Sequence, residues 1–378
     1  MRTKLVAAVV AGLLSAPAAH AQDANVTLYG RINLDMEVVN GKQSGTTCPN
    51  NCPNPHVFRV NSNSSEFGVR GNEPLGNGWS AIFQIENSIN PTQGRGVVTG
   101  RDSFVGFYGP LGTFKMGYFL GPYDDILSLF GNVPTLTSSI LATSALWAQG
   151  FAGPPENGGF DDRLRESIRY DTPTVSGLSA AFQFASYEGA VKPHSNAIST
   201  GAFYNNGPLQ VGVAYEAHDK IRGTPTHALS DHAFSVAGAY QFEYVRLGAV
   251  FERLNYDATS TTNLKRDFYG LGATADVGPG LLYLFVGRAG KGTGSAEDGT
   301  RIAGLTKGVK TASTQWEVSY TYLLSGRTLA YAGYVKIRNE SNAAYTFNHN
   351  PYPILCNPYP NGSCGKPGGF LVGMAHFF

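Results

Sequence analysis

The sequence has no long apolar run, few charges and few cysteines. Beyond its first 21 residues, no apolar stretch of this 378-residue chain approaches the roughly 18 residues that a transmembrane helix needs. Charged residues make up 15% and the net charge is +1, so the basic excess typical of a nucleic-acid-binding protein is absent. The chain is therefore predicted to be either soluble in the periplasm or embedded in a membrane through strands. We expect no nucleic acid among its partners.

The first 21 residues have the pattern of a signal peptide. Arg2 and Lys4 precede an apolar run over 5–14, and Ala19-His20-Ala21 fits the small-residue cleavage site. We therefore expect residues 1–21 to be a cleaved signal peptide and residues 22–378 to be a single exported domain.

The four cysteines fall into two local pairs, Cys48 with Cys52 and Cys356 with Cys364. In an exported protein such pairs are typical of disulfides. Bridges within each pair are expected because short loops close at small entropic cost, while pairing between the two segments stays the alternative. The first pair has C-x3-C spacing without matching histidines, so neither a metal site nor another cofactor is predicted.

Apolar and polar residues alternate over much of the chain. Val26, Leu28 and Ile32 share one parity, whereas Thr27 and Arg31 share the other. A period of two indicates strands with one oily and one wet face. The same alternation recurs near residues 79–86, 178–185, 234–241, 245–252 and 315–322. Over residues 329–338 apolar residues again alternate with positions that include Lys336 and Arg338. In a membrane barrel the apolar residues of each strand are expected to face lipid.

Short and long connections also alternate, which is typical of a membrane barrel. Seven tight turns and eight longer loops would join sixteen strands and leave both termini on one side. The turns are expected at 73–78, 109–112, 173–177, 205–208, 243–244, 278–280 and 325–327. The loops are expected at 40–57, 90–100, 120–162, 189–200, 219–230, 257–263, 290–312 and 340–368.

The chain finishes on an alternating segment whose last residue is Phe378. An open sheet edge cannot persist in lipid, so this segment is expected to pair with the first strand and close the barrel. Composition and pattern together predict an all-β protein, a 16-stranded antiparallel transmembrane β-barrel.

Several segments, in this order, resemble the Gram-negative general porins, particularly their β-proteobacterial branch. They are VTLYG (26–30), FGVRGNEPLG (67–76), AIFQIE (81–86), RDSFVGF (101–107), GTF (112–114), SIRYDTP (167–173) and VGM (372–374). The resemblance spans the mature chain. It implies a homotrimer in outer-membrane lipid that passes ions and small hydrophilic solutes.

In that family the third loop folds into the barrel and faces a ladder of arginines. Here the third loop, 120–162, is the longest connection, and its middle part carries no charge. The resemblance therefore implies a constriction whose acidic side is Asp124, Asp125 and Glu156. Strand parity places the basic candidates on the inner face: Arg31, Arg70, Arg101, Arg163, Arg165 and Arg169.

The chain departs from the family pattern at positions that are usually basic. Glu66 replaces an arginine, Tyr118 replaces a basic residue, and Ala375 and Phe377 flank His376. Each departure weakens a positive field, so only a slight preference for anions is implied.

Two rival functions remain open from the sequence. An outer-membrane hydrolase would need a nucleophile and a base, but no G-x-S-x-G or H-E-x-x-H motif occurs, and most histidines, His218 among them, fall in or near expected loops. A substrate-specific channel would share the barrel but would bind one particular solute. A surface adhesin or receptor would share the barrel and carry no ion current.

Overall fold

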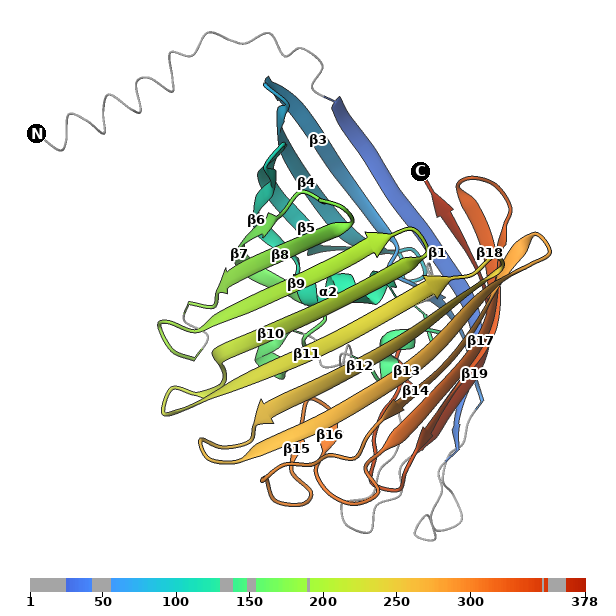
Figure 1. Ribbon diagram of the computed structural model, residues 1–378. Coiled ribbons are helices and arrows are strands. Elements are labelled where there is room, and N and C mark those ends of the chain that lie inside the picture. Colours follow the sequence, from blue (N-terminus) through green and yellow to red (C-terminus); the bar gives the residue numbers. More distant parts are fainter. Residues whose placement is uncertain are drawn as a thin grey trace, which may run out of the picture.

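The computed structural model describes residues 25–42, 56–129, 139–147, 154–188, 191–348, 350–352 and 365–378. The expected signal peptide and the four cysteines lie outside these residues, so both predictions stay open. The described chain forms a tilted β-barrel with short helical turns inside it (Figure 1).

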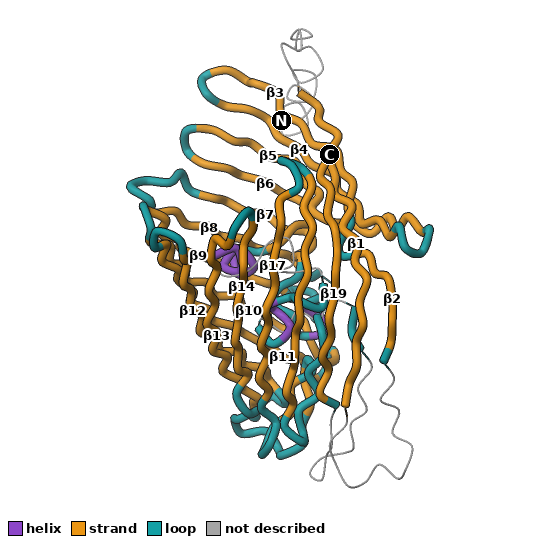
Figure 2. The backbone as a smooth tube through the Cα atoms, turned by 90° about the vertical axis from the view of Figure 1, so that its right-hand side faces the viewer, coloured by secondary structure: helices purple, strands orange, loops and turns teal. Residues whose placement is uncertain are grey.

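Seventeen strand segments form the barrel sheet, which Figure 2 shows from the side. They are β1 (Asn25–Lys42), β2 (Val57–Ser62), β3 (Glu66–Gly76), β4 (Trp79–Asn90), β5 (Arg95–Gly109), β6 (Gly112–Leu120), β7 (Arg163–Asp171), β8 (Leu178–Ser186), β9 (Asn196–Asn206), β10 (Leu209–Thr224), β11 (His227–Gln241), β12 (Val245–Asp257), β13 (Asn263–Val277), β14 (Gly280–Ala289), β17 (Ser313–Leu323), β18 (Thr328–Asn339) and β19 (Lys366–Phe377). A separate small hairpin joins β15 (Arg301–Ile302) to β16 (Leu305–Thr306).

The segments β2 and β3 are two parts of one strand, because both pair with β1 on either side of a short break at residues 63–65. The barrel therefore has sixteen strands, as predicted. Each strand pairs antiparallel with its neighbour, and β19 returns to pair with β1 over the register Arg31↔Phe377 to Lys42↔Lys366. Closure leaves no unpaired sheet edge, which is the condition for a barrel in lipid.

All seven predicted tight turns are confirmed, since each coincides with a short connection between consecutive strands. Two predicted loops are shorter than expected. The β4–β5 connection is confined to residues 91–94, and the β10–β11 connection is confined to 225–226. In both places the strand pairing continues to the barrel rim through residues whose composition alone suggested a loop.

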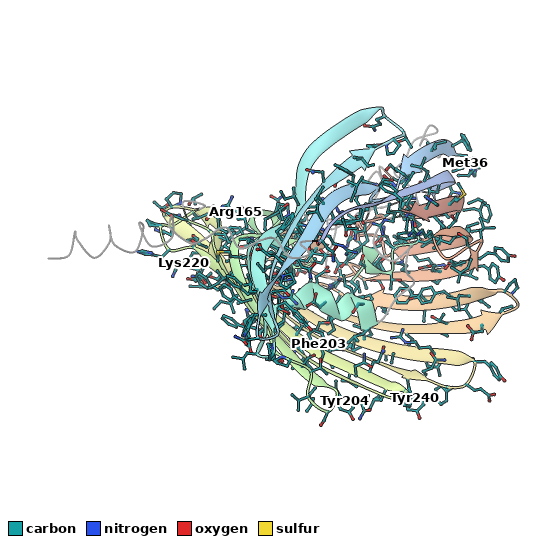
Figure 3. All side chains as sticks on the ribbon, turned by 90° about the horizontal axis from the view of Figure 1, so that it is seen from above. Met36, Arg165, Phe203, Tyr204, Lys220 and Tyr240 are labelled. Atoms are coloured by element: carbon teal, nitrogen blue, oxygen red, sulfur yellow. The ribbon has the colours of Figure 1, made fainter. Side chains whose placement is uncertain are left out.

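Apolar side chains cover most of the outer surface. Val26, Leu28 and Met36 of β1 are exposed, whereas Asn33 and Glu37 of the same strand are buried inside (Figure 3 labels Met36). This alternation confirms the predicted apolar outside for most strands.

Strand β18 is an exception to that pattern. Its apolar residues Tyr331, Val335 and Ile337 are buried on the inner side, and Tyr331 donates a hydrogen bond of 2.7 Å to Asn33 on the inner face of β1. The expectation that this apolar parity faces lipid is therefore wrong. The reason is that the third loop packs on this wall, so the inner face of β18 borders protein rather than water.

The third loop folds into the barrel, as the resemblance implied. Its described parts hold α2 (Pro122–Asp125), η1 (Ile126–Leu129), η2 (Thr143–Ala145) and η4 (Pro155–Asn157), which lie within the ring of strands (Figures 1 and 2). No helix in the described residues has the length and apolar character needed to cross a membrane.

Candidate functional site at the third loop

The start of the third loop is tied to the wall by a buried carboxylate. Tyr123 donates its hydroxyl to Glu252 Oε2 at 2.8 Å, and its backbone N–H donates to Ser199 Oγ at 3.0 Å. The other oxygen of Glu252 pairs with Arg266 of β13, whose guanidinium also donates to the carbonyl of Leu146. One buried ion pair thus holds two parts of the loop that lie far apart in sequence.

The uncharged middle of the loop lies against β13 to β18. Gln315 donates to the carbonyl of Ala142 at 2.9 Å, and Thr143 and Tyr283 share a hydrogen bond of 3.2 Å. Trp147 is fully buried and stacks on Phe268, with ring centroids 6.4 Å apart. The absence of charge suits a stretch that packs against the barrel wall, because a buried charge without a partner is costly in free energy.

The last described part of the loop packs on β10 and β12. Phe160 stacks on His218 at 4.5 Å between ring centroids, and Tyr256 donates to the carbonyl of Gly158 at 2.8 Å. His218 is buried and lies 2.8 Å from Glu216 Oε1. His218, which was expected in or near the external loop at 219–230, lies within β10, and the third loop covers it.

The eighth loop also folds inward, which sequence reasoning missed. Asn348 donates to Ser144 Oγ of the third loop at 2.9 Å, and Arg59 of β2 donates to the carbonyl of Asn350. Phe347 is completely buried. The described part of the eighth loop therefore forms a second layer on the third loop. Its aromatic residues were the one feature of the sequence that could have indicated burial.

The predicted arginines line the opposite wall, β1 to β7. Arg31 and Arg101 both reach Glu66 Oε2, at 3.2 and 2.6 Å, and Arg101 also pairs with Glu86. The Glu66 carboxylate lies between Arg31 and Arg101 and offsets part of their positive field. Glu66 is also the residue that replaces the arginine expected from the resemblance.

The other arginines approach the third loop. Arg169 pairs with Asp125 at the start of the loop, and Arg165 lies 3.3 Å from Glu156 near its end. Arg163 pairs with Asp102 of β5 at 2.6 Å. Two of the three predicted acidic residues thus meet predicted basic residues directly.

Arg70 differs from the other five arginines. Its guanidinium lies over the ring of Tyr29 at 4.8 Å, and no carboxylate lies within ion-pair distance in the described part of the chain. Arg70 is also exposed. It therefore presents the least compensated positive charge of the predicted set.

Sequence reasoning did not identify the partners that neutralise these arginines, which are the wall carboxylates Glu66, Glu86, Asp102 and Asp171. Strand parity could have placed Glu66, Glu86 and Asp171 on the inner face. It could not have placed Asp102 there together with the adjacent Arg101, because the β4–β5 register shifts opposite these two residues. Among the described residues no group of three or more potential metal ligands is arranged to hold an ion.

Burial changes the acidity of the loop carboxyls. Burial, reinforced by the charge of Asp125, raises the pKa of Asp124 to about 8. The pKa of Asp161 is also raised, first by burial and then by the nearby charge of Asp124. The ionised form of a carboxyl is disfavoured wherever water is removed and like charges gather. Asp124 and Asp161 therefore titrate above the ordinary carboxyl range.

Phe378 lies at the closing seam of the barrel. Its backbone N–H donates to the carbonyl of Gly30, and the N–H of Gly30 donates to the carbonyl of Phe378, both at 3.1 Å. The two residues thus continue the β1–β19 ladder to the end of the chain.

Known proteins share both the sequence pattern and the fold. The chain is 24% identical over 384 residues to outer membrane porin protein 32 of Delftia acidovorans, with full coverage of both chains. It is 29% identical over 230 residues to the major outer membrane protein P.IB of Neisseria meningitidis, covering 59% of this chain and 61% of that protein.

Two solved structures have the same fold. An anion-selective porin from Comamonas acidovorans superposes with a TM-score of 0.71 at 21% identity, covering 94% of this chain and 100% of that one. OmpT of Vibrio cholerae in its trimer form gives 0.64 at 13% identity, with coverage of 94% and 100%. The family model described as Gram-negative porin matches residues 6–342. That match takes in most of the sequence, so the chain belongs to the Gram-negative porin family.

Proposed function

We propose that this outer-membrane porin conducts through a constriction between the third loop and the arginine-bearing wall of β1 to β7. As a general-diffusion channel it passes ions and small hydrophilic solutes. The proposal depends most on the contacts between Asp125 and Arg169 and between Glu156 and Arg165, because each joins the loop to that wall. Fixed charges of opposite sign around a pore filter ions and orient dipolar solutes.

The selectivity that we propose is weak and favours anions. Most arginines at the constriction have a carboxylate partner, so the net field is small. Arg70 is the exception and adds a positive charge with little compensation. The solved relative from Comamonas acidovorans is itself named anion-selective, which supports the direction.

The test is the reversal potential of single channels in a salt gradient. Replacement of Arg70 by methionine should shift the reversal potential toward cations, and Arg31→Met should do the same while leaving Glu66 paired with Arg101. An unchanged reversal potential in both variants would remove these two residues from the ion path. A protein that carries no ion current at all would contradict channel function and favour an adhesin or receptor.

We further propose a homotrimer in outer-membrane lipid without catalytic activity. OmpT of Vibrio cholerae is a trimer with the same fold, and the porin family consists of channels rather than enzymes. Cross-linking of the protein in detergent should give a three-subunit species. A purely monomeric species would contradict the trimer without affecting the channel.

A further inference from the structure

A cavity of about 410 Å³ lies beside the start of the third loop. It is bounded by η1, by the last residues of β7 and β9, and by the β7–β8 turn at residues 172–177. That turn is one of the short connections, which lie on the same side of the barrel as Phe378 and therefore on the periplasmic side. A solute that leaves the constriction toward the periplasm would meet this cavity first.

The arginine in this cavity is poorly suited to hold an anion. Arg169 directs its N–H groups at protein oxygen atoms: one at the carbonyl of Leu120 at 3.1 Å, two at Asp171 at 2.9 and 2.7 Å, and one at Asp125. Four of the five guanidinium N–H groups are therefore occupied. The side chain of Arg169 is only 8% exposed.

The carboxylates, in contrast, keep acceptor capacity that faces the cavity. The oxygens Asp125 Oδ1 and Asp171 Oδ2 have no other hydrogen-bond donor among the described residues. Their side chains are 36% and 28% exposed. A ligand at this place would be recognised mainly through its hydrogen-bond donors.

The charge balance favours a neutral ligand. Arg169 lies between the two carboxylates, and Lys115 is its register partner on β6. Two positive side chains thus balance two negative ones. A cation would gain little net attraction here, and an anion would face two carboxylates.

The cavity also has an aromatic side. The ring of Phe203 lies flat on the wall over Gly201 and Gly212, where an added Cβ would come within 2.8 and 2.9 Å of the ring. Glycine at both positions lets the ring lie flush with the sheet. Figure 3 shows Phe203 inside the barrel beside the helical turns and Tyr204, the next residue, on the outside.

We infer that this cavity is a binding subsite for neutral polyhydroxylated solutes about the size of a simple sugar. Sugar hydroxyls would donate to Asp125 and Asp171, and the C–H face of a sugar ring would pack on Phe203. Cavities of a few hundred Å³ with an apolar side and a few fixed polar groups are typical small-molecule sites. The inference rests on the proposed channel function and specifies one solute class for it.

The experiment is single-channel recording in potassium chloride with glucose added to the periplasmic side. Wild-type protein should show excess current noise that saturates with glucose concentration. Phe203→Ala should weaken the apparent glucose affinity about tenfold, the scale expected when a packing or hydrogen-bonding partner is lost. Tyr240→Ala is the matched control, because Tyr240 is an aromatic residue exposed on the outer face of β11 and does not line the cavity, and it should leave the glucose response unchanged.

A second variant probes the polar side. Ser179→Ala removes one hydroxyl from the cavity lining without breaking the ion pairs of Arg169, and it should also weaken glucose affinity. Glucose noise that does not saturate, or that is identical in wild type, Phe203→Ala and Ser179→Ala, would overturn the subsite. Loss of the potassium chloride current itself would instead contradict the channel, so the two failures are distinguishable.

Discussion

Tyr123 and Glu252 are joined by a hydrogen bond of 2.8 Å that fixes the entry of the third loop to the barrel wall. Glu252 also pairs with Arg266, which holds the carbonyl of Leu146 further along the loop. Both members of this ion pair are fully buried. Removing one partner of such a pair typically costs about 3 to 5 kcal/mol, because the other charge stays buried without compensation.

We therefore predict that Glu252→Gln loosens the third loop. Single-channel recordings should show larger current fluctuations and a higher mean conductance than wild type. The matched control is Asp267→Asn, because Asp267 pairs with Arg253 across the same two strands but on the outer side. Equal current fluctuations in the two variants would contradict a specific clamp on the loop.

Glu66 is predicted to limit the anion preference. It neutralises Arg31 and Arg101 together, so Glu66→Gln should shift the reversal potential toward anions. A unit charge about 10 Å from an ion in water is worth about 0.4 kcal/mol, which corresponds to roughly a twofold change in permeability ratio. Glu73→Gln lies on the same strand at the opposite parity and should have no effect. A shift toward cations in Glu66→Gln would contradict this role.

Selectivity should also depend on pH through Asp124. Because its pKa is raised to about 8, acidification from pH 9 to pH 6 should protonate it and remove negative charge from the loop. The reversal potential should then move toward anions. Asp124→Asn should abolish this part of the titration, and an unchanged titration in that variant would exclude Asp124 as its source.

The raised pKa of Asp124 also affects the stability of the third loop. A carboxyl whose pKa is raised on folding contributes stability that is fully present below its ordinary pKa of 3.8 and is lost as the pH rises through about 8. The loop should therefore be more readily displaced at pH 9 than at pH 6. Protease sensitivity of the loop at the two pH values measures this difference, and Asp124→Asn should remove it.

The closing seam leaves no room for a side chain at Gly30. An added Cβ would come within 2.5 Å of both the carbonyl oxygen of Glu66 and the ring of Phe378. Gly30→Ala should cost about 1 to 3 kcal/mol through overpacking and lower the yield of folded barrel on refolding in detergent. Gly326→Ala, in a turn with open space around it, should refold like wild type. Equal yields would show that the seam tolerates the extra atom.

The strands and tight turns could be predicted from the sequence because they depend on local rules. Alternation over β1 and the Gly- and Pro-rich turns such as residues 173–177 fix where strands run and end. Local rules were less reliable at the rim, where β10 and β11 pair further outward than their polar composition suggested.

The site was predicted only in part. Parity put the six arginines on the inner face, but it does not tell which carboxylate each arginine meets. Glu66 comes between Arg31 and Arg101 only because β1, β3 and β5 lie close together in the folded wall.

The sequence by itself determined the barrel, its strand number and the length and charge pattern of the loop that enters it, because alternation and turn chemistry act over a few residues. Only the tertiary structure decided that the inner face of β18 is apolar, that Glu252 and Arg266 clamp the third loop, and that Phe203 flanks a cavity. These features depend on contacts between residues far apart in the chain, which the closure of the sheet brings together.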